Sequence, residues 1–227
     1  MIRSFAALAA ALLATTARAE SPRWGSFEFQ AGTYLPDIDS EFAGTTVRPF
    51  ADILGGSGWM FRAGVSRALF TSAGSLEVGV QSGYFQKTGK GRFLNGAESP
   101  DETKLKIIPM SLTLTYRFDV LAERLHVPLA PYARVGLERF AWWVTDGNGD
   151  TSMKGATNGW SAAAGLALLL DFFDPGLARE MDADSGVNHT YLFAEARKTT
   201  IDDFGSSSSW NLSEKNIAWS GGLLFIF

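Results

Sequence analysis

The sequence has 227 residues, of which 46% are hydrophobic, 13% aromatic and 19% charged, and this composition excludes a disordered chain. The 20 Lys and Arg residues face 24 Asp and Glu residues, a formal net charge of −4, so we expect no nucleic-acid partner. The absence of cysteine excludes disulfides and thiolate metal sites, and two histidines are too few for a histidine-rich metal centre. We therefore expect neither a cofactor nor a metal.

The first nineteen residues have the features of an export signal. Arg3 supplies a positive charge, an Ala- and Leu-rich apolar run covers residues 5–15, and Ala17-Arg18-Ala19 fits the small-x-small cleavage rule. The apolar run is shorter than the about 20 residues that a membrane helix needs. We predict that residues 1–19 are a cleaved signal peptide and that residues 20–227 form one domain.

Eight later segments alternate between large apolar and small or polar residues with a period of two, which predicts β-strands. In the first segment, residues 24–35, Phe27 and Phe29 flank Glu28. The other segments are residues 59–66, 76–83, 108–117, 133–138, 160–168, 192–197 and 217–227. The fifth and seventh strands are the most irregular, because Phe140 and Tyr191 fall on their polar faces.

The polar face of these segments consists of Gly, Ser, Ala and Thr with single charges of both signs. A soluble barrel would place flexible polar residues on its solvent face and large apolar ones inside. A cation on the lipid face of a membrane barrel costs about 2–4 kcal/mol at mid-depth, so these charges are expected in the lumen. Buried charges have to be paired, which predicts an ion-pair network that closes the lumen. Its members are Glu28, Arg62, Glu77, Arg117, Arg134, Glu138, Glu195 and Arg197.

The large apolar residues are then expected to face lipid, with aromatic residues near the strand ends at the membrane interfaces. The predicted interface residues are Trp24, Trp59, Tyr84, Tyr116, Trp142, Trp143, Trp160 and Trp219. The sequence thus predicts an all-β fold, an eight-stranded antiparallel transmembrane up-and-down β-barrel.

An even number of strands places both chain ends on the periplasmic side. The expected outer loops are residues 36–57, 86–102, 145–157 and 198–214, which are rich in Gly, Ser, Asp and Asn. The expected inner connections are residues 67–74, 118–130 and 173–188. Asp174-Pro175 is typical of a helix start, so we predict short helices at 175–181 and at 121–125 in these connections.

The whole predicted mature chain resembles small bacterial outer-membrane β-barrels with the architecture of the OmpA transmembrane domain and OmpX. The last strand carries Trp219, Leu223, Phe225 and Phe227 on one face and resembles the terminal strand that the barrel-assembly machinery recognises. Residues 116–124 (YRFDVLAER), 171–182 (DFFDPGLAREMD) and 186–193 (GVNHTYLF) resemble an uncharacterised myxobacterial family of outer-membrane barrels. These resemblances imply integration in the cell outer membrane, with outer-membrane lipids and lipopolysaccharide as partners, and they transfer no catalytic residue.

Candidate catalytic residues are few. His126 and His189 fall on the periplasmic connections, and no G-x-S-x-G motif occurs. We therefore expect no enzyme and interpret His189 as a residue that hydrogen-bonds the neighbouring turn. An outer-membrane lipid hydrolase that uses one of these histidines is the weakest alternative.

Two acidic loop segments have the donor atoms of a cation site without a complete motif. Residues 146–150 (DGNGD) begin like a calcium-binding EF-hand loop, but Thr157 stands where the motif needs Glu. Asp37, Asp39 and Glu41 cluster on the first outer loop. We expect a flexible turn and a solvated acidic loop, respectively.

We expect an integral outer-membrane protein with a structural or surface-interaction role, whose loop partner is unknown. An eight-stranded barrel holds little more than its own side chains, so a wide aqueous pore is not expected. Two alternatives remain open. One is a narrow conduit or binder for small apolar compounds, as in OmpW-like barrels, and the other is a secreted soluble ligand-binding β-barrel.

Overall fold

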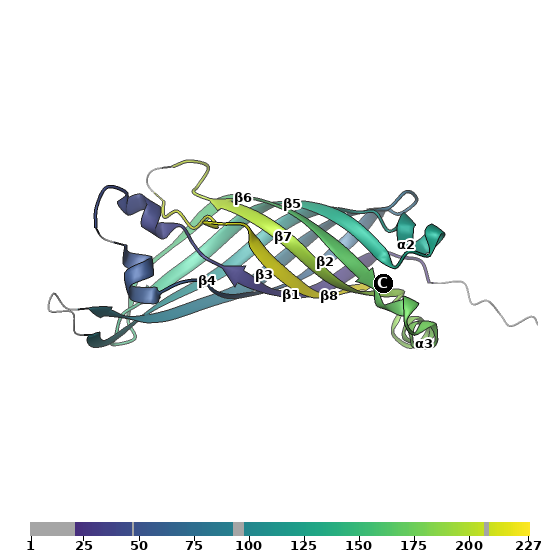
Figure 1. Cartoon of the computed structure of the whole chain (residues 1–227), viewed down its shortest axis with the longest axis horizontal. Helices are drawn as coiled ribbons and strands as arrows, with labels where there is room; N and C mark the ends of the chain where they lie inside the picture. Colours follow the sequence, from purple (N-terminus) through teal and green to yellow (C-terminus); the bar gives the residue numbers. More distant parts are fainter. Residues whose placement is uncertain (1–20, 47, 93–97, 207–208) are drawn as a thin grey trace, which may run out of the picture.

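The period-two alternation of the sequence is realised as a closed barrel of antiparallel strands (Figure 1). The computed structural model describes residues 21–46, 48–92, 98–206 and 209–227, so the predicted signal peptide lies outside the described residues. Each strand pairs with the next along the chain, and the last pairs with the first, which confirms the eight-stranded up-and-down barrel. The strands are β1 (Gly25–Tyr34), β2 (Gly58–Phe70), β3 (Ser75–Arg92), β4 (Glu98–Arg117), β5 (Leu129–Thr145), β6 (Thr151–Leu169), β7 (His189–Ile201) and β8 (Ala218–Ile226).

The register places apolar side chains of neighbouring strands side by side on the outer face. Phe27 in β1 lies opposite Val65 in β2 and Phe225 in β8, and the two phenylalanine rings stack with centroids 6.3 Å apart. A shift of one residue would turn every side chain of a strand to the other face. The alternation in each strand therefore fixes which residues face outward, and the register sets which neighbour each of them meets.

The β3–β4 and β5–β6 hairpins project beyond the other strands at one end of the barrel (Figure 1). Pairing continues to Lys90 opposite Glu102 and to Thr145 opposite Thr151. The predicted outer loops 86–102 and 145–157 are therefore wrong over most of their length. The reason is that these segments are rich in exposed polar residues, as loops are, although their backbones continue the strand pairing.

The connections at the opposite end of the barrel carry short helices, and the C-terminus lies beside them (Figure 1). They are α2 (Val120–Leu125), the 3₁₀ turn η3 (Leu170–Phe172) and α3 (Pro175–Ser185). Asp174 caps α3 by accepting hydrogen bonds from the backbone N–H groups of Gly176 and Leu177 at 3.1 and 3.0 Å. The helix extends four residues beyond its predicted end, to Ser185, and is followed by Gly186, whose φ of 70° suits a glycine C-cap.

A cap covers the mouth of the barrel at the projecting end (Figure 1). Its first part is the β1–β2 connection, which contains a 3₁₀ turn η1 (Ile38–Phe42) and a π-helical turn η2 (Phe50–Leu54). Its second part is the β7–β8 segment, of which the structure describes residues 202–206 and 209–217. The two parts join where the backbone N–H of Asp37 donates to the Ser213 carbonyl at 2.9 Å, and that of Lys215 to the Leu35 carbonyl at 2.9 Å.

Every helix within the described ranges is too short or too polar to cross a membrane.

Candidate functional site

The barrel interior contains a cluster of buried charged side chains between mid-height and the helical end. They come from β1, β2, β3, β4, β5 and β7, and each occupies an inward position of its strand. Their exposed fractions lie between 1% and 7%. The structure places all the lumen residues proposed from the sequence here: Glu28, Arg62, Glu77, Arg117, Arg134, Glu138, Glu195 and Arg197.

Most of these side chains form one connected chain of ion pairs. Arg134 contacts Glu28 at 2.6 Å and Glu195 at 3.6 Å. Arg197 contacts Glu195 at 2.6 Å and Glu138 at 3.8 Å. Glu138 also pairs with Arg62, at 3.2 Å, which extends the chain from β1 to β2 across the lumen. Arg117 and Glu77 form a further pair nearer the helical end.

Hydroxyl groups supply hydrogen bonds to the carboxylates that the ion pairs leave incomplete. Ser161 donates to Glu138 at 2.7 Å, and the Tyr132 hydroxyl donates to Glu195 at 3.0 Å. Ser26 donates to Glu77 at 2.7 Å. Sequence reasoning assigned the serines to the polar face but did not recognise them as partners of the carboxylates. The sequence pattern could have indicated this role, because these serines lie on the same face of their strands as the charged residues.

Asp119 extends the charged cluster to the helical end of the barrel. This buried residue lies between β4 and α2, and its carboxylate is 3.8 Å from Arg117 and 3.9 Å from Arg23. The Ser75 hydroxyl at the start of β3 also donates to it. Asp119 therefore ties the inner connections to the lumen network, a role that the sequence pattern did not predict because the residue lies outside the alternating segments.

The inward residues of β5 show that the interior has three layers along the barrel axis. In order from the helical end they are Tyr132, Arg134, Glu138, Phe140 and Trp142, so that charged residues lie between aromatic ones. The Arg62 guanidinium stacks over the Phe140 ring at 5.5 Å from its centroid. The charged layer is therefore enclosed between two apolar layers, and sequence reasoning missed both of these.

The apolar layers are formed by buried clusters at the two ends of the lumen. The layer toward the cap, called here the outer apolar layer, contains Tyr34, Ile38, Phe50, Met60, Phe85, Leu105, Ile107, Phe140, Trp142, Ile201 and Leu212. The layer toward the helices, the inner apolar layer, contains Ala130, Tyr132, Ala167, Tyr191, Phe193, Leu224 and Ile226. Phe140 and Tyr191, which disturb the alternation in the sequence, are members of these layers.

Glu214 in the β7–β8 segment reaches down to the charged layer from the cap. With Arg62 and Arg197 it lines a cavity of about 20 Å³. Burial raises the pKa of Glu214 to about 7, and Arg62 and Arg197 oppose this rise without cancelling it. A second cavity of about 10 Å³ lies among Glu28, Glu77 and neighbouring residues. Each cavity has room for about one water molecule.

Six of the predicted interface aromatics are exposed on the outer wall. Their exposed fractions range from 42% to 66%, and they are Trp24, Trp59, Tyr84, Tyr116, Trp160 and Trp219. Trp142 was assigned wrongly, because its side chain is buried and stacks on Trp210 of the cap with ring centroids 4.3 Å apart. The neighbouring Trp143 is half-buried. The error arises because Trp142 lies in the projecting part of β5, where the inward face is apolar.

The histidines lie at the helical end. The imidazole Nδ1 of His189 is 2.8 Å from the carboxylate of Asp171 in η3, so His189 does contact the neighbouring turn. His126 is exposed and ends α2 in a left-handed conformation with φ of 55°. Both line a depression of about 590 Å³ between α2 and α3. No described residues form a group of three or more His, Cys, Asp or Glu side chains able to hold a metal ion.

The acidic loop residues bind backbone groups. Asp146 accepts hydrogen bonds from the backbone N–H groups of Asn148 and Asp150 at 3.2 and 3.1 Å, which makes residues 146–150 a tight turn. Asp39 accepts from the N–H groups of Phe50 and Ala51 at 2.8 and 3.1 Å and so connects η1 to η2. These carboxylates hold loops in place.

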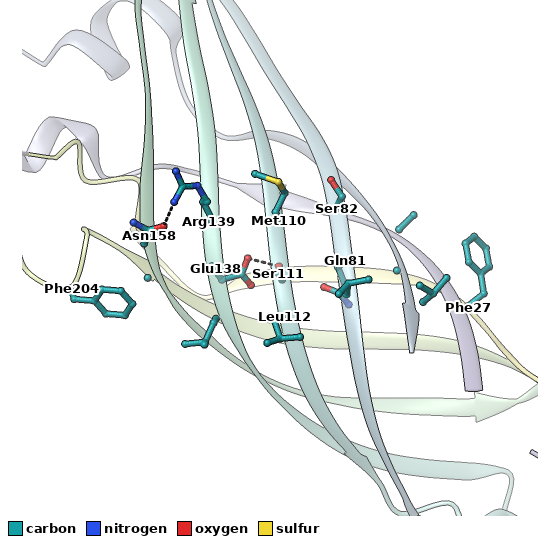
Figure 2. Close-up of a pocket in the computed structure, with 16 residues that line it drawn as sticks. Phe27, Gln81, Ser82, Met110, Ser111, Leu112, Glu138, Arg139, Asn158 and Phe204 are labelled. Carbon is teal, nitrogen blue, oxygen red and sulfur yellow. Dashed lines mark hydrogen bonds between the residues drawn. The ribbon is translucent and has the colours of Figure 1, made fainter. Parts of the chain in front are cut away.

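A hollow of about 770 Å³ follows the strand wall, and Figure 2 shows the residues that line it. Met110 and Leu112 in its lining are 40% and 52% exposed, whereas Ser111 between them is buried and donates to Glu138. Because neighbouring strand residues point to opposite faces, the lining belongs to both sides of one wall and does not enclose a chamber. The exposed Phe204 borders its outer side.

Comparison with known proteins gives architectural likeness only. No family model matches the sequence, and no curated protein matches it. The chain is similar to the attachment invasion locus protein Ail of Yersinia pestis, solved in complex with the heparin analogue sucrose octasulfate. The TM-score is 0.43 with 10% identity, over 90% of this chain and 97% of Ail. It is also similar to a major outer membrane protein of Thermus thermophilus, with a TM-score of 0.41 and 13% identity over 89% and 99% of the two chains. Both TM-scores lie below 0.5, so the barrel assignment rests on the strand pairing described above.

Proposed function

We propose that this chain is an integral outer-membrane β-barrel with a closed lumen and a structural or surface-interaction role. The observation that carries the proposal is the distribution of side chains between the two faces of the wall. Apolar residues on the outer face of all eight strands are between 39% and 60% exposed. They are Phe29, Phe61, Val65, Val80, Leu112, Leu114, Val135, Leu137, Leu166, Leu192 and Leu223.

This distribution is favourable in lipid and unfavourable in water. A soluble protein rarely exposes a contiguous apolar patch of more than a few hundred Å². A continuous apolar belt around a barrel, with the charges inside, is the arrangement of a membrane-spanning barrel. A soluble ligand-binding barrel would carry the opposite arrangement. The exposed interface aromatics near the strand ends support the same proposal.

The three interior layers support the proposal of a closed lumen. Ion pairs occupy the middle of the lumen, and aromatic and aliphatic side chains occupy both ends. The two cavities inside the charged layer hold about one water each, which supports a sealed barrel. In this proposal the helical end faces the periplasm and the capped, projecting end faces the cell exterior, because long connections in such barrels lie outside.

Membrane integration is tested by fractionation and reconstitution of the full chain. We expect the protein in the outer-membrane fraction, soluble only with detergent, and with a gel mobility that changes on boiling. The purified protein is expected to float with lipid vesicles after refolding. Recovery of folded protein from the aqueous phase without detergent would overturn the proposal and favour the soluble barrel.

A further inference from the structure

The cap leaves an apolar cavity above the outer apolar layer. The cavity has a volume of about 260 Å³ and lies between the β1–β2 connection and the inward faces of the projecting strands. One side is formed by residues of η1 and η2 and the other by Leu105, Val144 and Met153 of β4, β5 and β6. Trp210 of the β7–β8 segment also lines it. It is separate from the ion pairs, which lie below the outer apolar layer.

The residues that line this cavity disfavour a charged ligand. Its residues are Ile38, Phe42, Pro49, Phe50, Ile53, Leu54, Thr103, Leu105, Val144, Met153 and Trp210, none of which is ionisable. A charged ligand would lose its hydration there without gaining a partner, which is strongly unfavourable. The electrostatic character of the cavity therefore matches a neutral hydrocarbon-like molecule.

The size and shape of the cavity favour a small ring compound. A cavity of about 150 Å³ lined by aliphatic and aromatic side chains accommodates benzene, and drug-sized ligands need more than about 300 Å³. The present volume lies between these limits. The indole of Trp210 is held by stacking on Trp142, with planes 1° apart, and so presents a fixed aromatic surface. Offset stacking on such a surface favours a flat ring.

The cap is held firmly enough to keep the cavity formed. Asp39 fixes η1 to η2 through its two backbone hydrogen bonds, and the Tyr34 hydroxyl donates to the Leu212 carbonyl at 2.5 Å. A Cβ on Gly89 of β3 would lie 1.7 Å from the carbonyl oxygen of Ile53, so only glycine allows η2 to approach the strand this closely. A preformed cavity lowers the ordering cost of binding.

We propose that this cavity is a binding site for a neutral aromatic molecule of one or two rings at the outer mouth of the barrel. Binding buries the apolar surface of the ligand against Leu105, Val144 and Trp210. The site ends on the outer apolar layer, so the ligand is held at the mouth and does not enter the charged layer. The inference stands on the cap and does not depend on where the barrel resides in the cell.

Equilibrium dialysis with radiolabelled naphthalene tests the site, using the purified, folded full chain in detergent. Val144→Trp fills the cavity, and Val135→Trp adds the same volume on the outer wall, where Val135 is 55% exposed. We expect saturable binding of about one naphthalene per chain, weakened at least about tenfold by V144W and unchanged in V135W, because only the first removes buried contact area. Each variant is first shown to keep its heat-modifiable mobility.

A second cavity-filling variant keeps the proposal testable if V144W does not fold. Met153 is 49% exposed at the open side of the cavity, so Met153→Trp narrows the site without disturbing buried packing. It is expected to weaken naphthalene binding in the same direction as V144W. Uptake that rises linearly without saturation, or that is equal in all variants, reflects partition into micelles and would overturn the proposal. Stronger binding of decane than of naphthalene would also overturn it, since the site would then hold an acyl chain.

Discussion

At the scale of single residues, each charge in the lumen is tolerated because of a specific partner. Arg134 illustrates this, since it bridges Glu28 and Glu195 and its Nε donates to the Thr115 hydroxyl at 2.9 Å. A buried ion pair contributes little net stability compared with an apolar pair of the same shape, but a buried charge without its partner is strongly destabilising. The presence of charged residues on the inner face was predictable from alternation. Their pairing was not, because alternation does not say which strands meet across the lumen.

Removal of one residue of a buried ion pair is therefore expected to lower the free energy of unfolding by more than removal of both. Arg134→Met leaves the carboxylate of Glu28 buried without its guanidinium, and we expect a loss of about 3–5 kcal/mol in the free energy of unfolding. The double variant with Glu28→Gln is expected to recover part of this loss. Urea titration of the protein refolded in vesicles measures both. A double variant less stable than R134M would contradict the pairing.

Glu214 predicts a pH dependence of stability. Burial raises its pKa from an ordinary value of 4.5 to about 7, although Arg62 and Arg197 oppose the rise; Glu138 and Thr199 also face it. Since the native state holds the proton more tightly, this stabilising contribution is complete below pH 4.5 and is lost as the pH rises through 7. We expect the thermal midpoint of the native gel form to fall between about pH 5 and 8 by more in the wild type than in Glu214→Gln. An equal fall of the thermal midpoint in the two proteins would contradict the raised pKa of Glu214.

At the scale of the strand, alternation predicts the segments well but not what each face touches. In β4 the outward residues change from Leu112 at mid-height to Lys104 and Lys106 near the cap, while Leu105 and Ile107 point inward. The period of two is unbroken, so the strand continues. The apolar phase changes because the surroundings change, from lipid outside to the cap inside. Sequence reasoning that fixed one phase for each strand therefore ended β4 and β5 too early and turned Trp142 outward.

The stability lost when a charged residue is placed on the outer face is expected to depend on its position along the strand. Leu112→Arg is expected to destabilise the barrel in lipid vesicles by about 2–4 kcal/mol, because Leu112 lies in the apolar belt. Thr88→Arg on the projecting part of β3, which lies beyond the belt, is expected to change stability by less than about 1 kcal/mol. Unfolding titrations in vesicles compare the two variants. Equal effects would mean that the belt does not face lipid.

At the scale of the whole molecule, the interior of the barrel is filled by layers of different chemistry. The outer apolar layer lies toward the cap, the charged layer lies at the centre, and the inner apolar layer lies at the helical end. The layers are joined where arginines stack on aromatic rings, Arg62 over Phe140 at 5.5 Å and Arg117 over Tyr191 at 5.7 Å. The proposed closure of the lumen therefore depends on interactions between layers as well as within them.

If the lumen is closed as proposed, the barrel conducts no ions. In planar lipid bilayers the purified protein should give no discrete openings, and Phe85→Ala, which opens space in the outer apolar layer alone, should give none either. The ion pairs below that layer still block the path in this variant. Stepwise conductance from the wild type would contradict closure and favour a narrow conduit.

The amino-acid pattern was sufficient for the eight strands, their antiparallel order and the inward phase of the charges, because alternate residues of a strand point to its two faces. It was also sufficient for the capped start of α3, since Asp174 and Pro175 act through local backbone geometry. The partners of Arg134, the inward turn of Trp142 and the apolar cavity beneath the cap emerged only in the folded barrel. Those features depend on contacts between segments far apart in the chain, and barrel closure and loop packing alone bring such segments together.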